Sequence, residues 1–228
     1  MKKTFLMTFL GAMVAVIPSA QATVIGVGGF CTSCGTPAGL SQTTLIADSG
    51  LQTLTSTNVT GTNLFNATFR SIVYQHATGG TLDFYYQFKV NSHTGSLGVV
   101  DFMSATTFAG FITNVGTLAT ALPGFAAGTA TPVGINQPAS GLIDFVFASP
   151  FIGGSPVTPG ITTVTMVIST NATNWTAGDA AAQDGSNATF AAFSPTAAVP
   201  EPASIVLFGS VLGLTALIAR RKLGPRKG

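Results

Sequence analysis

Few side chains between residues 23 and 199 could do acid–base or metal chemistry. The candidates are two histidines and six aspartates: His76, His93, Asp48, Asp83, Asp101, Asp144, Asp179 and Asp184. They could build a hydrolase or metal site, but no GxSxG nucleophile elbow, HExxH zinc motif or phosphate-binding P-loop accompanies them. The aspartates are too widely spread for a glycosidase pair to stand out. We therefore expect no catalytic residue, cofactor or metal, and keep a secreted hydrolase as an alternative.

Cys31 and Cys34 form a Cys-Thr-Ser-Cys sequence in a glycine-rich segment. In an oxidising compartment this pair is expected to close a small disulfide loop. The alternatives are a redox pair, which needs a helix N-terminus to lower the thiol pKa, and half of a zinc site, which needs two more ligands. Residues 35–37 show no helical pattern, and no histidine follows for haem attachment. A disulfide is therefore the prediction.

Aromatic residues raise the possibility of sugar binding. Trp175, Tyr74, Tyr85 and Tyr86 could form an exposed platform that stacks on sugar rings. The same rings at strand positions more often pack in a core or against a neighbouring strand. Carbohydrate binding is therefore kept as an alternative function.

Threonines suggest one further surface. Thr53, Thr55 and Thr57 fall on one face if residues 52–59 form a strand. A flat threonine array can order water, as in ice-binding proteins, but one strand without a repeat is no array. We interpret these threonines as solvent-facing strand residues, with an ice-binding-like surface as an alternative. The segment 179–184 offers oxygen atoms for calcium, but it lacks the spacing of an EF-hand loop.

The charge of the chain is concentrated at its ends. Seven of the nine basic residues lie outside residues 23–199, where only Arg70 and Lys89 oppose six aspartates, for a formal net charge of −4. No basic patch is present, so we expect no nucleic-acid partner. Threonine, serine, asparagine and glycine supply most of the polarity, which is typical of an extracellular β-protein.

Strand patterns dominate the middle of the chain. Residues 82–90 alternate apolar with polar or amphipathic side chains, which predicts a strand with one buried face. Further strands are expected at residues 43–48, 52–59, 68–75, 97–102, 108–113, 142–148, 162–169 and 189–193. Segments 122–141 and 149–160, rich in proline and glycine, predict long loops.

The fold class that follows is all-β. Many short strands without a sustained helical period predict an antiparallel β-sandwich or jelly-roll ectodomain over residues 23–175. Residues 176–199 are expected to hold the last strand and then a spacer.

Residues 1–22 resemble a secretory signal peptide. Lys2 and Lys3 begin a segment whose apolar stretch, expected to be helical, ends in an A-x-A pattern. We expect signal peptidase to cleave between Ala22 and Thr23. Residues 23–199 would then be exported.

The C-terminal end has the features of a membrane anchor. Residues 203–219 are uncharged and apolar, at the short end of what a helix needs to cross a hydrocarbon core of about 30 Å. A basic stop follows, which is expected to stay cytoplasmic together with residues 223–228. Its residues are Arg220, Arg221 and Lys222.

A short proline motif precedes the apolar segment. Pro200 and Pro202 flank Glu201, and two prolines cannot continue the helix outward. This motif, a marginal span and a basic stop together resemble the PEP-CTERM sorting tail, which exosortases of Gram-negative-type bacteria read. The resemblance covers residues 200–222 and implies cleavage near the motif. The alternative is an ordinary single-pass anchor.

These features predict an exported, non-enzymatic protein of the cell surface or extracellular matrix. Its expected partners are signal peptidase, an exosortase-like enzyme, the membrane and, in the carbohydrate-binding alternative, an exopolysaccharide. Its route crosses the inner membrane and includes an anchored stage.

Overall fold

The computed structural model describes residues 23–32, 34–56, 64–94, 100–138, 141–149, 151, 153–183 and 186–197. The predicted signal segment 1–22, the motif Pro200–Glu201–Pro202, the span 203–219 and the tail 220–228 lie outside these residues. The described part is all-β and contains no helix. Accordingly, it includes no helix with the length and apolar character needed to cross a membrane.

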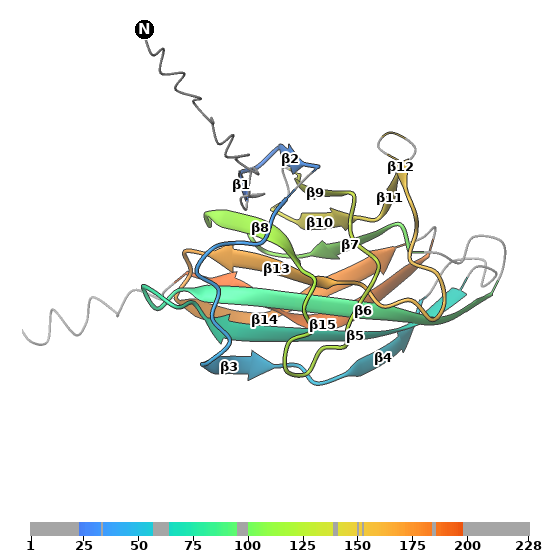
Figure 1. Cartoon of the computed structure of the whole chain (residues 1–228), viewed down its shortest axis with the longest axis horizontal. Helices are drawn as coiled ribbons and strands as arrows, with labels where there is room; N and C mark the ends of the chain where they lie inside the picture. Colours follow the sequence, from blue (N-terminus) through green and yellow to red (C-terminus); the bar gives the residue numbers. More distant parts are fainter. Residues whose placement is uncertain are drawn as a thin grey trace, which may run out of the picture.

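Two antiparallel sheets make up most of the described chain (Figure 1). In spatial order the first sheet, sheet A, consists of β1 (Thr23–Ile25), β8 (Thr113–Leu118), β13 (Thr165–Thr170), β6 (Leu82–Thr94), β5 (Leu64–Gln75) and β3 (Leu45–Asp48). Strand β4 (Gln52–Thr55) also pairs with β5, farther along the edge that β3 occupies. These strands position the candidate site.

Sheet B closes the other side of the molecule. Its order is β15 (Asn187–Thr196), β14 (Asn174–Gln183), β7 (Phe102–Ala105), β10 (Ile143–Val146), β9 (Gly134–Gln137) and β2 (Gly29–Cys31). A small ribbon of β11 (Ala148–Ser149) and β12 (Gly153–Gly154) projects beside it (Figure 1). The result is a sandwich-like arrangement, while the jelly-roll topology stays a prediction.

The main core lies between the two sheets because each long strand alternates its side chains between two faces. In β5, Phe65, Phe69 and Val73 point inward, and β6 contributes Phe84 and further apolar residues. The Phe69 ring stacks on Phe190 of β15 with 4.8 Å between ring centroids. Aromatic contacts of this kind tie sheet A to sheet B.

A smaller apolar cluster covers part of the outer face of sheet A. Ile72, Tyr85 and Val167 of three neighbouring strands are buried under Leu122 and Phe125. The two covering residues belong to the long connection between β8 and β9. The sequence predicted a loop over residues 122–141, but residues 134–137 of that segment form β9. This connection therefore packs across the sheet instead of extending into solvent.

The predicted strands agree best where alternation is strongest, as in β6. The prediction for segment 108–113 is wrong over most of its length, because only Thr113 belongs to β8. In segment 97–102, residues 97–99 lie outside the described residues, Val100 forms an isolated bridge with Val157, and Phe102 begins β7. The predicted domain boundary after Trp175 falls inside β14, and β14 with β15 forms a complete hairpin of sheet B. His93, expected in a turn, lies in β6.

Candidate ligand-binding groove

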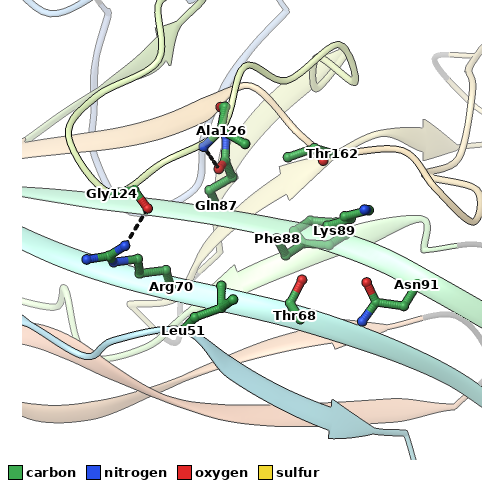
Figure 2. A pocket seen from close by; sticks show the side chains of 10 residues that line it. All are labelled: Leu51, Thr68, Arg70, Gln87, Phe88, Lys89, Asn91, Gly124, Ala126 and Thr162. Carbon is green, nitrogen blue, oxygen red and sulfur yellow. Dashed lines mark hydrogen bonds between the residues drawn. The ribbon is translucent and has the colours of Figure 1, made fainter.

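A groove of about 380 Å³ lies on the outer face of sheet A, next to the small apolar cluster (Figure 2). Strands β5 and β6 supply most of its lining, and the β3–β4 connection, the β8–β9 connection and the segment before β13 supply the rest. The lining residues are Leu51, Thr68, Arg70, Gln87, Phe88, Lys89, Asn91, Gly124, Ala126 and Thr162. No sequence motif pointed to this combination.

Arg70 closes one end of the groove. Its Nε and Nη2 atoms donate to the two carboxylate oxygens of Asp48 at 2.9 and 2.5 Å, and Nη1 donates to the Gly124 carbonyl at 2.6 Å. The bidentate geometry matches the planar guanidinium to the carboxylate. The neighbouring Arg70 guanidinium lowers the pKa of the Asp48 carboxyl below its ordinary value. Arg70 therefore acts mainly as a clamp between β5, β3 and the β8–β9 connection.

Gln87 secures the same connection. Its Nε2 donates to the carbonyl oxygens of Ala126 and Thr163, both at 2.9 Å, and its Oε1 accepts from the Ala126 N–H at 2.9 Å. Figure 2 shows this amide directed toward Ala126 and the Arg70 guanidinium directed toward Gly124. The polar groups at this end are thus occupied by the protein itself.

The opposite end of the groove is free of such contacts. Thr68 of β5 and Lys89 of β6 are cross-strand partners, and Lys89 forms a bridge with Thr162 on its other side. Among the described residues, the two hydroxyls and the ammonium have no hydrogen-bond or ion-pair partner. Lys89 is exposed, whereas Thr68 and Thr162 are half-buried. A polar row of hydroxyl, ammonium and hydroxyl therefore faces solvent.

Asn91 extends this free end. The pairing of β5 with β6 shifts register between Asn66 and Ala67, which leaves Asn91 as the extra residue of a β-bulge. Its Nδ2 donates to Asn66 Oδ1 at 2.8 Å, and Asn66 Nδ2 donates to Thr55 Oγ1 at 3.1 Å. This amide chain holds the Asn91 side chain beside the polar row. The bulge was not apparent from the alternation of residues 82–90.

His76 and Asp83 form the other notable polar contact on this face. The His76 Nδ1 atom lies 3.0 Å from both Asp83 carboxylate oxygens, and the Asp83 side chain is fully buried. Burial raises the pKa of Asp83, opposed by hydrogen bonds from Ser169 and His76. The imidazole packs closely against Gly39. The pair thus secures the segment before β3 against sheet A.

The other aspartates lie elsewhere. Asp101 and Asp144 line a shallow hollow of about 300 Å³ on sheet B beside Phe151, and burial raises the pKa of both. Asp144 Oδ1 accepts a hydrogen bond from Ser104 at 2.6 Å. Asp179 is exposed on β14, and Asp184 lies outside the described residues. Among the described residues, no three His, Cys, Asp or Glu side chains gather as a metal site would require.

Other predicted residues fall into three groups. Cys31 and Cys34 are joined by a disulfide. Tyr74, Tyr85 and Tyr86 are buried, so the four aromatic residues do not form an exposed platform; only Trp175 is partly exposed, and it packs edge-on against Phe193. Thr53 and Thr55 are exposed on β4, and Thr57 lies outside the described part of the chain.

The predicted signal-peptidase site lies directly before the first strand. Thr23, expected to follow the signal-peptidase cleavage bond, is the first residue of β1 and pairs with Val115 of β8. At the other end β15 ends at Thr196, only a few residues before Pro200. The described domain therefore occupies nearly the whole interval between the two predicted processing sites.

Comparison with known families identifies the tail. The model of the PEP-CTERM protein-sorting motif matches residues 198–222, which contain the proline motif, the apolar segment and the basic stop. No curated protein matches the chain, and no solved structure does. The motif implies export, membrane-associated sorting and processing by an exosortase-type enzyme. The chain therefore carries, as its tail predicted, the sorting motif of PEP-CTERM proteins.

Proposed function

We propose that this chain is a non-enzymatic protein of the cell surface or extracellular matrix in a Gram-negative-type bacterium. The observation that carries the proposal is the position of the sorting motif at residues 198–222, directly after the final strand β15. Signal peptidase and an exosortase-type enzyme would act at the two ends of the β-domain. The domain itself is the exported product.

The roles of the titratable side chains support a non-enzymatic function. His76 and Asp83 bond to each other against the sheet, and Arg70 is held by Asp48 and Gly124. Each of these groups secures a connecting segment on sheet A. A general base needs a free atom within reach of a substrate proton. His76 Nδ1 is bonded to Asp83, and the Nε2 edge of the ring lies against Gly39.

The test of sorting is the intact mass of the protein recovered from native cell surface and medium. We expect a species that begins at Thr23 and ends near Glu201. A recovered mass that still includes residues 203–228 would contradict sorting and would make the protein a plain membrane-anchored one. Replacing Pro200-Glu201-Pro202 with three alanines should leave the export signal intact and block the second cleavage.

A second candidate function is carbohydrate binding, which the groove on sheet A favours. Its free end offers two hydroxyls and an ammonium that bond to no described residue, beside the Asn91 amide, and Leu51 provides an apolar wall toward the Arg70 end. Sugar sites combine such polar groups with apolar contact surface. Affinity electrophoresis in gels containing neutral or acidic polysaccharides should retard the full-length chain. Equal mobility in all of these gels would contradict this second function.

A further inference from the structure

We propose that the free end of the groove binds an acidic sugar, with the Lys89 ammonium paired to the sugar carboxylate. This inference rests on the carbohydrate-binding function above and names its ligand class. The site consists of Thr68, Lys89, Asn91 and Thr162, and Leu51 lies toward the Arg70 end of the same groove. Figure 2 shows these polar side chains at the end of the groove away from the Arg70 clamp.

The distribution of positive charge is the first argument. Arg70 and Lys89 are the only basic residues between positions 23 and 199, and both line this groove. Arg70 is bonded to the Asp48 carboxylate and to the Gly124 carbonyl. Lys89 forms no ion pair with any described carboxylate. It therefore supplies the unpaired positive charge on the described surface of a domain that is otherwise acidic.

The neighbours of Lys89 are the second argument. Thr68 lies on β5 to one side of it, and Thr162, in the segment before β13, forms a bridge with it on the other side. Paired backbones of this kind are about 4.8 Å apart. The bulge places the Asn91 amide at the next position along β6. Hydroxyls and amides both donate and accept hydrogen bonds, as sugar hydroxyls require. The ligand that matches this set carries several hydroxyls beside one carboxylate.

An apolar wall completes the match. Leu51 is 72% exposed at the edge of the groove, and the methylene stem of Lys89 adds further apolar surface. Leu51 lies toward the Arg70 end of the groove, so neighbouring rings of an oligosaccharide can cover these two apolar surfaces. A small inorganic anion would use the ammonium and leave this surface uncovered.

The negative charge of the domain limits how acidic the ligand is. Six aspartates oppose two basic residues between positions 23 and 199. Charges farther apart than about 8 Å are screened at physiological ionic strength, so Lys89 attracts a nearby carboxylate although the domain is acidic. A densely charged polyanion would bring many carboxylates near the aspartates. The best ligand therefore spaces its acidic units with neutral sugars.

The experiment is calorimetric titration of the full-length chain in zwitterionic detergent with a tetrasaccharide of alternating glucuronic acid and N-acetylglucosamine. The carboxyl-reduced form of the same tetrasaccharide serves as the neutral counterpart, and tetraglutamate as an anion without sugar. We expect the acidic tetrasaccharide to bind at least about threefold more tightly than either, because a charge-assisted hydrogen bond is added to the sugar contacts.

Substitutions at two positions of the site, Lys89 and Thr68, locate it, with a control on sheet B. Lys89→Met keeps the apolar stem and should weaken binding of the acidic tetrasaccharide about three- to tenfold, while Lys89→Arg should retain it. Thr68→Val should also weaken binding, whereas Thr176→Val, at an exposed position of β14 on sheet B, should not. Basic residues near the chain ends are the same in every variant, so they do not affect the comparison. Circular dichroism should confirm that each variant folds.

The possible outcomes separate this inference from the proposed functions. If the acidic and reduced tetrasaccharides bind equally, and Lys89→Met does not change this, the proposal of an acidic ligand is wrong. Carbohydrate binding would still be supported. If tetraglutamate binds as tightly as the acidic tetrasaccharide, the site recognises an anion and the proposal of a sugar ligand is wrong. If neither tetrasaccharide binds, the inference is wrong whatever the intact-mass measurement shows about sorting.

Discussion

Gly124 adopts a backbone conformation that other residues rarely accept, with φ at +88°. A Cβ atom at this position would lie 2.6 Å from Arg70 Cζ, because the guanidinium packs directly against the glycine. We predict that Gly124→Ala lowers the free energy of unfolding by about 1–3 kcal/mol, measured by urea denaturation. The matched control is Gly160→Ala, where φ is +84° but no atom lies within 4 Å of the added Cβ. Equal losses in the two variants would show that the Arg70 contact contributes nothing.

Asp144 provides a test of pH dependence. Burial raises the pKa of the Asp144 carboxyl above its ordinary value of about 3.9. The stability that the protonated carboxyl contributes is therefore fully present below that value and is lost as the pH rises through the raised pKa. Asp144→Asn should flatten the stability profile between about pH 4 and pH 7, because the amide keeps an acceptor for Ser104. Thermal unfolding across this range measures the effect. Asp179→Asn, which removes a charge from an exposed position, should leave the slope unchanged; a matching change would assign the effect to net charge.

At the scale of elements, the β14–β15 hairpin depends on the main core. Phe190 is fully buried and stacks on Phe69 of the opposite sheet. Phe190→Ala should lower the free energy of unfolding by about 3–5 kcal/mol, because it removes the ring and leaves a cavity. The control Phe151→Ala, at a side chain 93% exposed, should change it by less than about 0.5 kcal/mol. A small loss at Phe190 would mean that the two sheets are not coupled through this contact.

The misplaced strands show what an apolar pattern can and cannot predict. Phe108 and Val100 are buried, so some hydrophobic residues of segments 97–102 and 108–113 do mark core positions, whereas Ile112 is 62% exposed. Phe108 reaches Phe84 edge-on from just outside a strand, with 5.5 Å between ring centroids. A side chain can be buried although its backbone is not hydrogen-bonded to a neighbouring strand. Strand position is decided by pairing partners far away in the sequence.

At the scale of the whole molecule, the boundary of the folded domain can be tested by truncation. A chain that starts at Thr23 and ends at residue 197 keeps every described strand and should unfold cooperatively. A chain that ends at residue 173 loses β14 and β15 and with them Ala180, Ala182 and Phe190 of the core. We predict that it has no cooperative transition in near-ultraviolet circular dichroism. A cooperative transition in the shorter chain would restore the boundary predicted after Trp175.

The sequence by itself determined the sorting motif of this protein and its structural class. Sorting signals are linear segments, so their charge, apolar length and prolines can be recognised in the sequence alone. The family match at residues 198–222 agrees with the motif predicted there. Alternation in residues 82–90 likewise predicted β6, because the period-two placement of side chains is a local property of a strand, although residues 82–88 are buried on both faces. The disulfide between Cys31 and Cys34 joins neighbours only three positions apart.

Only the tertiary structure decided which polar groups stay available for a ligand. Arg70 and Lys89 look alike in the sequence, yet Asp48 and Gly124 reach Arg70 from positions 22 and 54 residues away. Lys89 instead meets Thr68 and Thr162 through strand pairing. The tyrosines of β6 likewise became core residues because elements distant in sequence cover both faces of the sheet. Such contacts depend on chain topology, which no local pattern encodes.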